Sequence, residues 1–96
     1  LAKRGIIVIG ENMKGRVIPY AKKIGARWYR ARGKNPSNWL KNNREALRVW
    51  QEKGKKIIDI GRDPKRTRIR QPNDPYEMET RILRKNRYPV TRDPQP

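Results

Sequence analysis

The chain has 96 residues, with 26 Lys and Arg against nine Asp and Glu, no Cys and no His, and a formal charge of +17. A chain of this length has room for one domain with one core, and the missing Cys and His exclude disulfides, thiol or imidazole catalysis and the usual zinc ligands. The charge predicts a polyanionic partner, because so basic a domain repels itself, and the longest apolar run, Ile6 to Ile9, is too short for a membrane-spanning helix.

The N-terminal third of the chain is predicted to form a strand, a helix and a second strand. Residues 5–10, GIIVIG, are a β-branched run between two glycines, which is typical of a strand buried on both faces. Apolar residues recur at helical spacing from about Arg16 to Ile24, and Gly25 is suited to end that helix. Residues 26–30 are then predicted to form a short strand.

The middle of the chain predicts a loop, a longer helix and a third strand. The helix is expected over about Trp39–Lys53, with Ser37 or Asn38 as its N-cap. Residues 57–61, IIDIG, repeat the isoleucine-rich strand pattern with one polar interruption, Asp59.

A basic, proline-punctuated loop is predicted from residue 61 to residue 73. The next four residues, Asp74-Pro75-Tyr76-Glu77, place Asp at the N-cap, Pro at the first helical position and Glu at the third. This arrangement is typical of a capping box, so we expect a last helix that runs to about Asn86.

The alternation of strands and helices predicts an α/β fold with a small three-stranded, at least partly parallel sheet and about three helices. An α+β fold with a mixed or antiparallel sheet is the alternative, because the sequence does not fix strand direction. We expect residues 1–96 to be a single basic domain with a frayed tail at 89–96. The start at Leu1 rather than Met suggests a domain excised from the C-terminus of a larger polypeptide.

If the two isoleucine-rich strands are parallel neighbours, their carboxyl ends meet at the edge of the sheet where α/β proteins bind ligands. Burial raises the pKa of a carboxylate and nearby cations lower it, so one carboxylate can act as a base while guanidinium groups neutralise charge on a phosphate. The candidate catalytic residues are Glu11, Asp59, Arg62, Asp63, Tyr76 and Glu77. Two structural alternatives stay open, namely that Asp59 is a charge the fold tolerates and that Glu77 serves the capping box.

Residues 65–70, KRTRIR, are the densest run of positive charge and predict a flexible clamp on a nucleic-acid backbone, with a solvated loop as the alternative. Trp28 or Tyr29 is expected to be exposed and available to stack on a base. Trp39 and Trp50 are eleven residues apart on one helical face and are expected in the core. The candidate nucleic-acid-binding residues are Lys65, Arg66, Arg68, Arg70, Trp28, Arg30 and Arg81.

The segments GIIVIGENMKGRV, NPSNWLKNN, KKIIDIGRDPKR and PYEMETRIL, with Tyr88-Pro89 after them, resemble the C-terminal toxin modules of bacterial polymorphic toxins of the Rhs and contact-dependent inhibition type. The resemblance spans nearly the whole chain. It implies a secreted or delivered effector that acts in the cytoplasm of a competing cell. It also implies an acidic cognate immunity protein that inhibits the monomeric toxin by forming a heterodimer with it. Many such modules are nucleases, commonly ribonucleases, and others are DNases, deaminases or ADP-ribosyltransferases.

The function expected from these observations is a metal-independent ribonuclease toxin without a cofactor, acting on transfer RNA or ribosomal RNA. The RNA 2′-hydroxyl would attack the adjacent phosphorus. The candidate bases are Glu11, Asp59 and Glu77, and the candidate charge-stabilising residues are Arg62, Arg66 and Arg68. One alternative is a DNase that holds Mg²⁺ through Glu11, Asp59 and Asp63. The other is a nucleic-acid-binding domain without catalysis.

Overall fold

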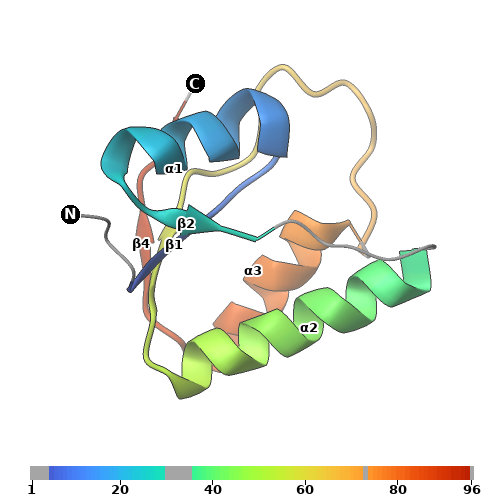
Figure 1. Ribbon diagram of the computed structural model, residues 1–96. Coiled ribbons are helices and arrows are strands. Elements are labelled where there is room, and N and C mark those ends of the chain that lie inside the picture. Colours follow the sequence, from blue (N-terminus) through green and yellow to red (C-terminus); the bar gives the residue numbers. More distant parts are fainter. Residues whose placement is uncertain (1–4, 30–35, 73, 96) are drawn as a thin grey trace.

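The structure, a computed structural model, describes residues 5–29, 36–72 and 74–95, which form an α/β domain (Figure 1). Within these residues the strands are β1 (Ile6–Ile9), β2 (Arg27–Trp28), β3 (Lys56–Asp59) and β4 (Val90–Arg92). The helices are α1 (Ile18–Ile24), α2 (Pro36–Glu52) and α3 (Pro75–Lys85), and a π-helical turn, Met13–Val17, precedes α1. The predicted fold class is confirmed.

The sheet has the strand order β2-β1-β3-β4, and all three neighbouring pairs are parallel. The two isoleucine-rich strands lie side by side in register, from Ile6 opposite Lys56 to Ile9 opposite Asp59. The prediction that they run in the same direction is therefore confirmed, and the antiparallel alternative is wrong.

The expected frayed tail is instead the fourth strand of the sheet. Val90, Thr91 and Arg92 pair with Ile57, Ile58 and Asp59 of β3. The pairing continues past β4, where the backbone N–H of residue 93 donates to the carbonyl of residue 59 at 2.9 Å. This strand was not predicted because three residues between two prolines are too few to show an alternating pattern.

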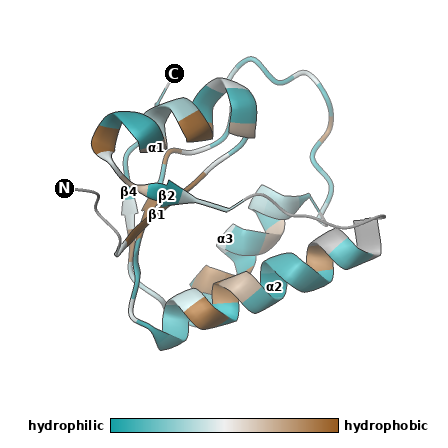
Figure 2. Cartoon of the chain, viewed as in Figure 1, coloured by the Kyte–Doolittle hydropathy of each residue, from teal (hydrophilic) through white to brown (hydrophobic). Residues whose placement is uncertain are grey.

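The helices cover both faces of the sheet, with α1 on one face and α2 and α3 on the other (Figure 1). Successive strand residues point to opposite faces, and each face has its own core. The core toward α2 and α3 consists of Ile7, Ile9, Leu47, Trp50, Ile57, Met78 and Leu83. The core toward α1 consists of Val8, Val17, Ala21, Ala26, Ile58 and Ile60. Figure 2 shows the hydrophobic strand β1 and helices along which hydrophobic and hydrophilic residues alternate.

The helices follow the predicted spans, with shifted starts. Residue 18, not residue 16, begins α1, which places Pro19 in the first turn, where the missing proline N–H is tolerated. Gly25 ends α1 at a φ of 71°, as predicted. Because α2 begins at Pro36, the predicted N-cap at Ser37 or Asn38 is wrong.

Trp50 of α2 is buried, and its ring packs edge-on against Tyr29 with 5.8 Å between the ring centroids. The Trp39 side chain, expected to share that core, lies outside the described residues. No helix in the described part of the chain is both long and apolar enough to span a membrane.

The capping box predicted at the start of α3 is not formed, although Pro75 begins the helix as expected. Asp74 makes no side-chain cap; its Oδ2 instead accepts hydrogen bonds from the Gln71 N–H at 3.0 Å and from Arg66 Nη2 at 2.7 Å. The Glu77 carboxylate accepts from Arg62 at 2.6 and 3.2 Å. Charged guanidinium donors outcompete the helix N–H groups for both carboxylates, because charge-assisted hydrogen bonds are the stronger ones.

Candidate functional site

The edge of the sheet at which the site was predicted lies where the strand order reverses, between the carboxyl ends of β1 and β3. Ligands of open parallel sheets bind in the crevice at this point. The Ile60 N–H donates to the Ile9 carbonyl at 3.0 Å, and the Glu11 N–H donates to the Gly61 carbonyl at 3.3 Å. The two strands therefore bring Glu11 and the loop that starts at Gly61 to the same edge.

Glu11 is buried at this edge and is surrounded by donors. Arg70 donates Nε to Oε2 at 2.8 Å and Nη2 to Oε1 at 2.6 Å, Arg66 donates Nη1 to Oε2 at 2.9 Å, and the Asp63 N–H donates to Oε1 at 2.8 Å. Burial would raise the pKa of Glu11, but the hydrogen bonds from Arg70 and Asp63 and the charges of both arginines hold it below its ordinary value. Glu11 thus anchors the loop through these hydrogen bonds.

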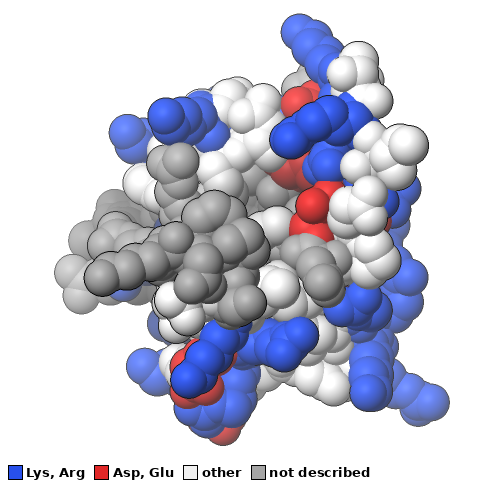
Figure 3. All heavy atoms as spheres, turned by 90° about the vertical axis from the view of Figure 1, so that its right-hand side faces the viewer, with Lys and Arg blue, Asp and Glu red and all other residues white. Residues whose placement is uncertain are grey.

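The basic loop is folded over this anchor. Arg66 and Arg70, two of the cations predicted to clamp a phosphate backbone, contact Glu11 of the same chain. Lys65 and Arg68 are exposed on the loop and face solvent. Figure 3 shows the side of the molecule that carries this loop, where Asp and Glu side chains appear in small groups bordered by Lys and Arg.

Asp63 is also held by its neighbours in the loop. Its Oδ1 accepts from the Lys65 N–H at 2.9 Å, and its Oδ2 accepts from Asn12 Nδ2 at 3.3 Å. The backbone hydrogen bond from Lys65 is the largest of the causes that lower the pKa of Asp63. Asp63 therefore shapes the turn after β3.

Asp59, at the carboxyl end of β3, forms a buried pair with Tyr76 of α3. The Tyr76 hydroxyl donates to Asp59 Oδ1 at 2.8 Å and to Oδ2 at 3.0 Å, and the Gly61 N–H donates to Oδ1 at 2.8 Å. Burial raises the pKa of Tyr76, and its hydrogen bond to Asp59 raises it further. Tyr76 therefore stays protonated and acts as a hydrogen-bond donor that orients the Asp59 carboxylate.

Glu79 lies one helical turn beyond Tyr76 on α3 and is 7% exposed. Burial raises the pKa of Glu79 to about 8, with a smaller contribution from the charge of Asp59. Glu79 accordingly binds a proton at neutral pH, and the sequence pattern did not distinguish it from the other acidic residues of α3.

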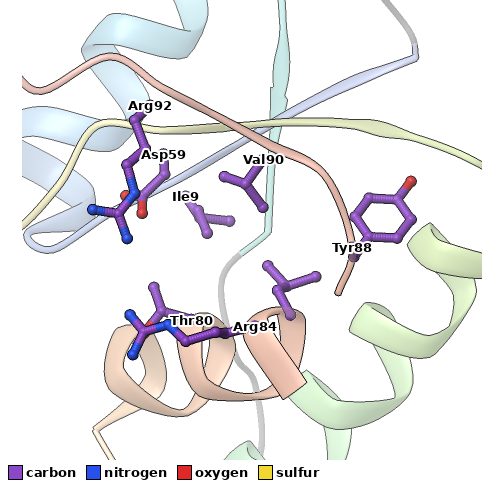
Figure 4. Close-up of a pocket in the computed structure, with 8 residues that line it drawn as sticks. Ile9, Asp59, Thr80, Arg84, Tyr88, Val90 and Arg92 are labelled. Carbon is purple, nitrogen blue, oxygen red and sulfur yellow. The ribbon is translucent and has the colours of Figure 1, made fainter. Parts of the chain in front are cut away.

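Two adjoining cavities meet at Asp59. The inner cavity, of about 210 Å³, is lined by Ile9, Asp59, Thr80, Leu83, Arg84, Tyr88, Val90 and Arg92 (Figure 4). The outer cavity, of about 440 Å³, is lined by Asp59, Gly61, Arg62, Tyr76, Glu77, Thr80, Arg84, Arg92 and Pro94. Both cavities share Asp59, Thr80, Arg84 and Arg92, so these four residues form a polar waist between them.

Arg84 and Arg92 are the arginines of the waist, and the sequence analysis did not single them out. Both are exposed, and within the described part of the chain their guanidinium groups have no ion pair or side-chain hydrogen bond. In Figure 4 both groups lie on the same side of the inner cavity as the Asp59 carboxylate. Arg84 could have been found four residues after Thr80 on one helical face, whereas Arg92 belongs to the strand that was expected to be frayed.

Arg16 is a second residue that sequence reasoning missed. Its Nη1 donates to the carbonyls of Glu11 at 3.2 Å and Gly61 at 3.0 Å, and its Nη2 donates to the carbonyls of Ile60 at 3.0 Å and Gln95. One buried guanidinium thereby joins the segments that follow β1, β3 and β4. Nothing in the basic composition of the chain marks this arginine as different from the others.

The remaining candidates lie apart from the waist. Trp28 is 37% exposed on the edge strand β2, at the opposite edge of the sheet from β4, with Lys22 Nζ 5.9 Å from its ring centroid. Arg81 is exposed on α3 and lines neither cavity. Arg30 lies outside the described residues. Arg62, 60% exposed, reaches the rim of the outer cavity while paired with Glu77.

The described residues contain no group of three or more His, Cys, Asp or Glu side chains placed to hold a metal ion. Of the three carboxylates predicted for Mg²⁺, Asp59 lines the cavities, whereas Glu11 and Asp63 are engaged with the basic loop. Comparison with known proteins found no match to a family model, a curated protein or a solved structure.

Proposed function

We propose that this protein is a ribonuclease that cleaves the phosphodiester backbone at the waist between the two cavities. The observation that supports this most is the position of Asp59. Its carboxylate is oriented by Tyr76 and Gly61. It lines the same cavities as Arg84 and Arg92, which have no carboxylate partner among the described residues. A base beside cations that remain available for an anion suits phosphoryl chemistry.

In this proposal Asp59 takes the proton from the 2′-hydroxyl of the substrate. A carboxylate oxygen accepts up to two hydrogen bonds, and among the described residues Asp59 Oδ2 accepts only the 3.0 Å bond from Tyr76. The 2′-oxygen then bonds to the adjacent phosphorus and the bond to the 5′-oxygen breaks. That oxygen takes a proton from water, and the hydroxide left behind takes the proton from Asp59. The products are a 2′,3′-cyclic phosphate and a 5′-hydroxyl.

Arg84 and Arg92 bind the non-bridging phosphate oxygens and stabilise the charge that develops on them. Of the three bases considered from the sequence, Glu11 and Glu77 are occupied by guanidinium groups. Asp59 is accordingly the base that we propose. Within the same proposal, the basic surface holds the RNA backbone through its phosphates.

The proposed setting is the one that the resemblance implies, a toxin that acts in the cytoplasm of a competing bacterium and that an acidic inhibitor neutralises. The +17 charge supports a polyanionic substrate and an acidic partner equally. Expression of the chain in a bacterial host should arrest growth, and the Asp59→Asn variant should relieve the arrest.

The direct test is incubation of the purified protein with total bacterial RNA in EDTA. The wild type should generate fragments with 2′,3′-cyclic phosphate ends, and Asp59→Asn should not. Glu52→Gln is the matched control, because Glu52 is exposed on α2 and pairs with Arg48. RNA that stays intact in EDTA contradicts the proposal. Nicking of plasmid DNA that requires Mg²⁺ would instead favour the DNase. If the protein binds RNA without cleaving it, and Asp59→Asn does not change that binding, the non-catalytic nucleic-acid-binding domain would be favoured.

A further inference from the structure

We propose that the inner cavity is a subsite for the heterocyclic base of one nucleotide, whose phosphate lies at Arg84 and Arg92. This inference rests on the proposed function in placing a nucleotide phosphate at the waist. It goes further in naming what the protein recognises: a base, and not the charged backbone alone.

One part of the inner cavity is apolar and can contact the flat face of a base, whereas the waist residues line the rest with polar groups. Beyond the waist it is lined by Ile9, Leu83, Val90 and the ring of Tyr88. The Tyr88 hydroxyl donates to the Lys55 carbonyl, and Figure 4 shows it pointing away from the cavity. The tyrosine is therefore fixed with its apolar ring toward the cavity, and an aromatic wall of this kind favours a base over a sugar or a phosphate.

The size of the inner cavity limits what it can take. Whole small-molecule sites have volumes of about 300–1,000 Å³, and the inner cavity has about 210 Å³. It has room for a fragment such as one base. The outer cavity, of about 440 Å³, lies on the other side of the waist and offers space for the sugar and the phosphate.

The waist supplies the polar groups that such a nucleotide needs. Arg84 comes from α3, and Arg92 lies on β4 in register with Asp59 of β3, so the two guanidinium groups approach the waist from different elements. Paired guanidinium groups suit a phosphate because their N–H groups match its oxygens. The Thr80 hydroxyl donates to the Glu77 carbonyl at 3.1 Å, which leaves its oxygen able to accept a hydrogen bond from a base or sugar.

Calorimetric titration with small probes tests the subsite without RNA cleavage. The probes are the four ribonucleoside 3′-monophosphates, ribose 5-phosphate and inorganic phosphate. At least one nucleotide should bind about tenfold or more tightly than ribose 5-phosphate, which lacks the base. Equal binding of ribose 5-phosphate and all four nucleotides would overturn the proposal.

The cavity-filling variant Val90→Phe should lose this advantage of the nucleotide while binding ribose 5-phosphate as the wild type does. Thr91→Phe is the matched control, because the next residue of β4 faces the other side of the sheet and does not line the inner cavity. Arg84→Met changes an exposed helical residue and should weaken the binding of nucleotide and ribose 5-phosphate alike. This test remains possible even if Val90→Phe fails to fold. Unchanged nucleotide binding by a folded Val90→Phe, or by Arg84→Met, would also overturn the proposal.

Nucleotide binding and RNA cleavage are separate measurements, so they test the base subsite and the ribonuclease independently. If the protein binds nucleotides selectively but RNA stays intact in EDTA, the ribonuclease proposal is contradicted and the base subsite is supported. RNA cleavage by a protein that binds nucleotides and ribose 5-phosphate equally would remove the subsite and leave the ribonuclease.

Discussion

Arg70 holds Glu11 with two hydrogen bonds, Nε to Oε2 at 2.8 Å and Nη2 to Oε1 at 2.6 Å, and the carboxylate that it holds is almost completely buried. This pair attaches a loop of the third βα unit to the carboxyl end of β1, at the point where the strand order reverses. The crevice that serves many parallel sheets as a ligand site is here occupied by the chain's own arginines. The proposed catalytic residues accordingly lie one strand further along the sheet, between β3, β4 and α3.

Replacing Arg70 by Met should lower the free energy of unfolding, because a buried carboxylate loses a two-point partner while Arg66 still neutralises part of its charge. Chemical denaturation measures this change in the free energy of unfolding. Arg62→Met is the control, since Arg62 is largely exposed, and its loss should lower the free energy of unfolding much less than the loss of Arg70 does. Equal effects of the two substitutions would contradict the anchoring role of Glu11.

Glu79 should make the protein less stable as the pH rises from about 4.5 to 8. The folded state keeps a proton on Glu79 up to a pKa of about 8, whereas the unfolded chain loses it near the ordinary value of 4.5. In this window the folded state binds more protons, so the free energy of unfolding falls with pH, by up to about 1.4 kcal/mol per unit from this group.

Glu79→Gln should flatten that slope and stabilise the protein at pH 8 relative to the wild type. Denaturation curves at pH 5.5 and 8.5 are the measurement. Glu11, Asp63 and Asp74 have lowered pKa values, so their contributions are present throughout this range and are lost only at lower pH. A variant whose unfolding free energy depends on pH as the wild type's does would show that Glu79 is not the group responsible.

Tyr76→Phe should reduce the rate of RNA cleavage by about tenfold to a hundredfold while leaving RNA affinity nearly unchanged. The phenyl ring keeps the packing of α3, but Asp59 loses the donor that orients both its oxygens. The loss should fall on kcat rather than on KM, which distinguishes positioning of Asp59 from substrate binding. A rise in KM at constant kcat would place Tyr76 among the substrate contacts instead.

The sequence predicted the fold well because the dominant signals are local. Two isoleucine-rich runs, each followed by a glycine, mark the central strands, and the longer helices show clear apolar periodicity. The fourth strand was missed because only three residues of it pair, and its stability comes from β3 beside it and not from a pattern of its own.

The sequence predicted that the carboxyl ends of β1 and β3 meet at one edge of the sheet, but it did not predict the cavities that adjoin Asp59 between β3, β4 and α3. Glu11, Asp59 and the basic loop do meet at one edge, as parallel strands require. What sequence could not predict is which cation pairs with which carboxylate, because any of many arginines could reach Glu11 or Glu77. Arg92 lies on the unpredicted strand β4. A segment without a recognisable strand pattern therefore supplies one of the two arginines of the waist.

Arg16→Lys should destabilise the protein by roughly 2–4 kcal/mol and should loosen the C-terminal segment first. The guanidinium reaches four carbonyls from three segments, whereas a lysine ammonium has three donors on a narrower head and would leave buried carbonyls without a partner. Gln95 is the partner farthest along the chain, and its segment follows β4. The backbone amides of Asp93 and Gln95 should therefore exchange hydrogen faster than those of β1 or β3.

Arg44→Lys serves as the control, because Arg44 is exposed on α2 and lines a different cavity, and its exchange profile should match that of the wild type. Since β4 also carries Arg92, loosening this segment should weaken RNA cleavage in Arg16→Lys although Arg16 lies outside both cavities at Asp59. Uniform acceleration of exchange across the sheet would show instead that Arg16 supports the whole domain. If Arg16→Lys shows fast exchange after β4 but keeps full cleavage activity, the position of β4 is not required for the chemistry proposed at Asp59.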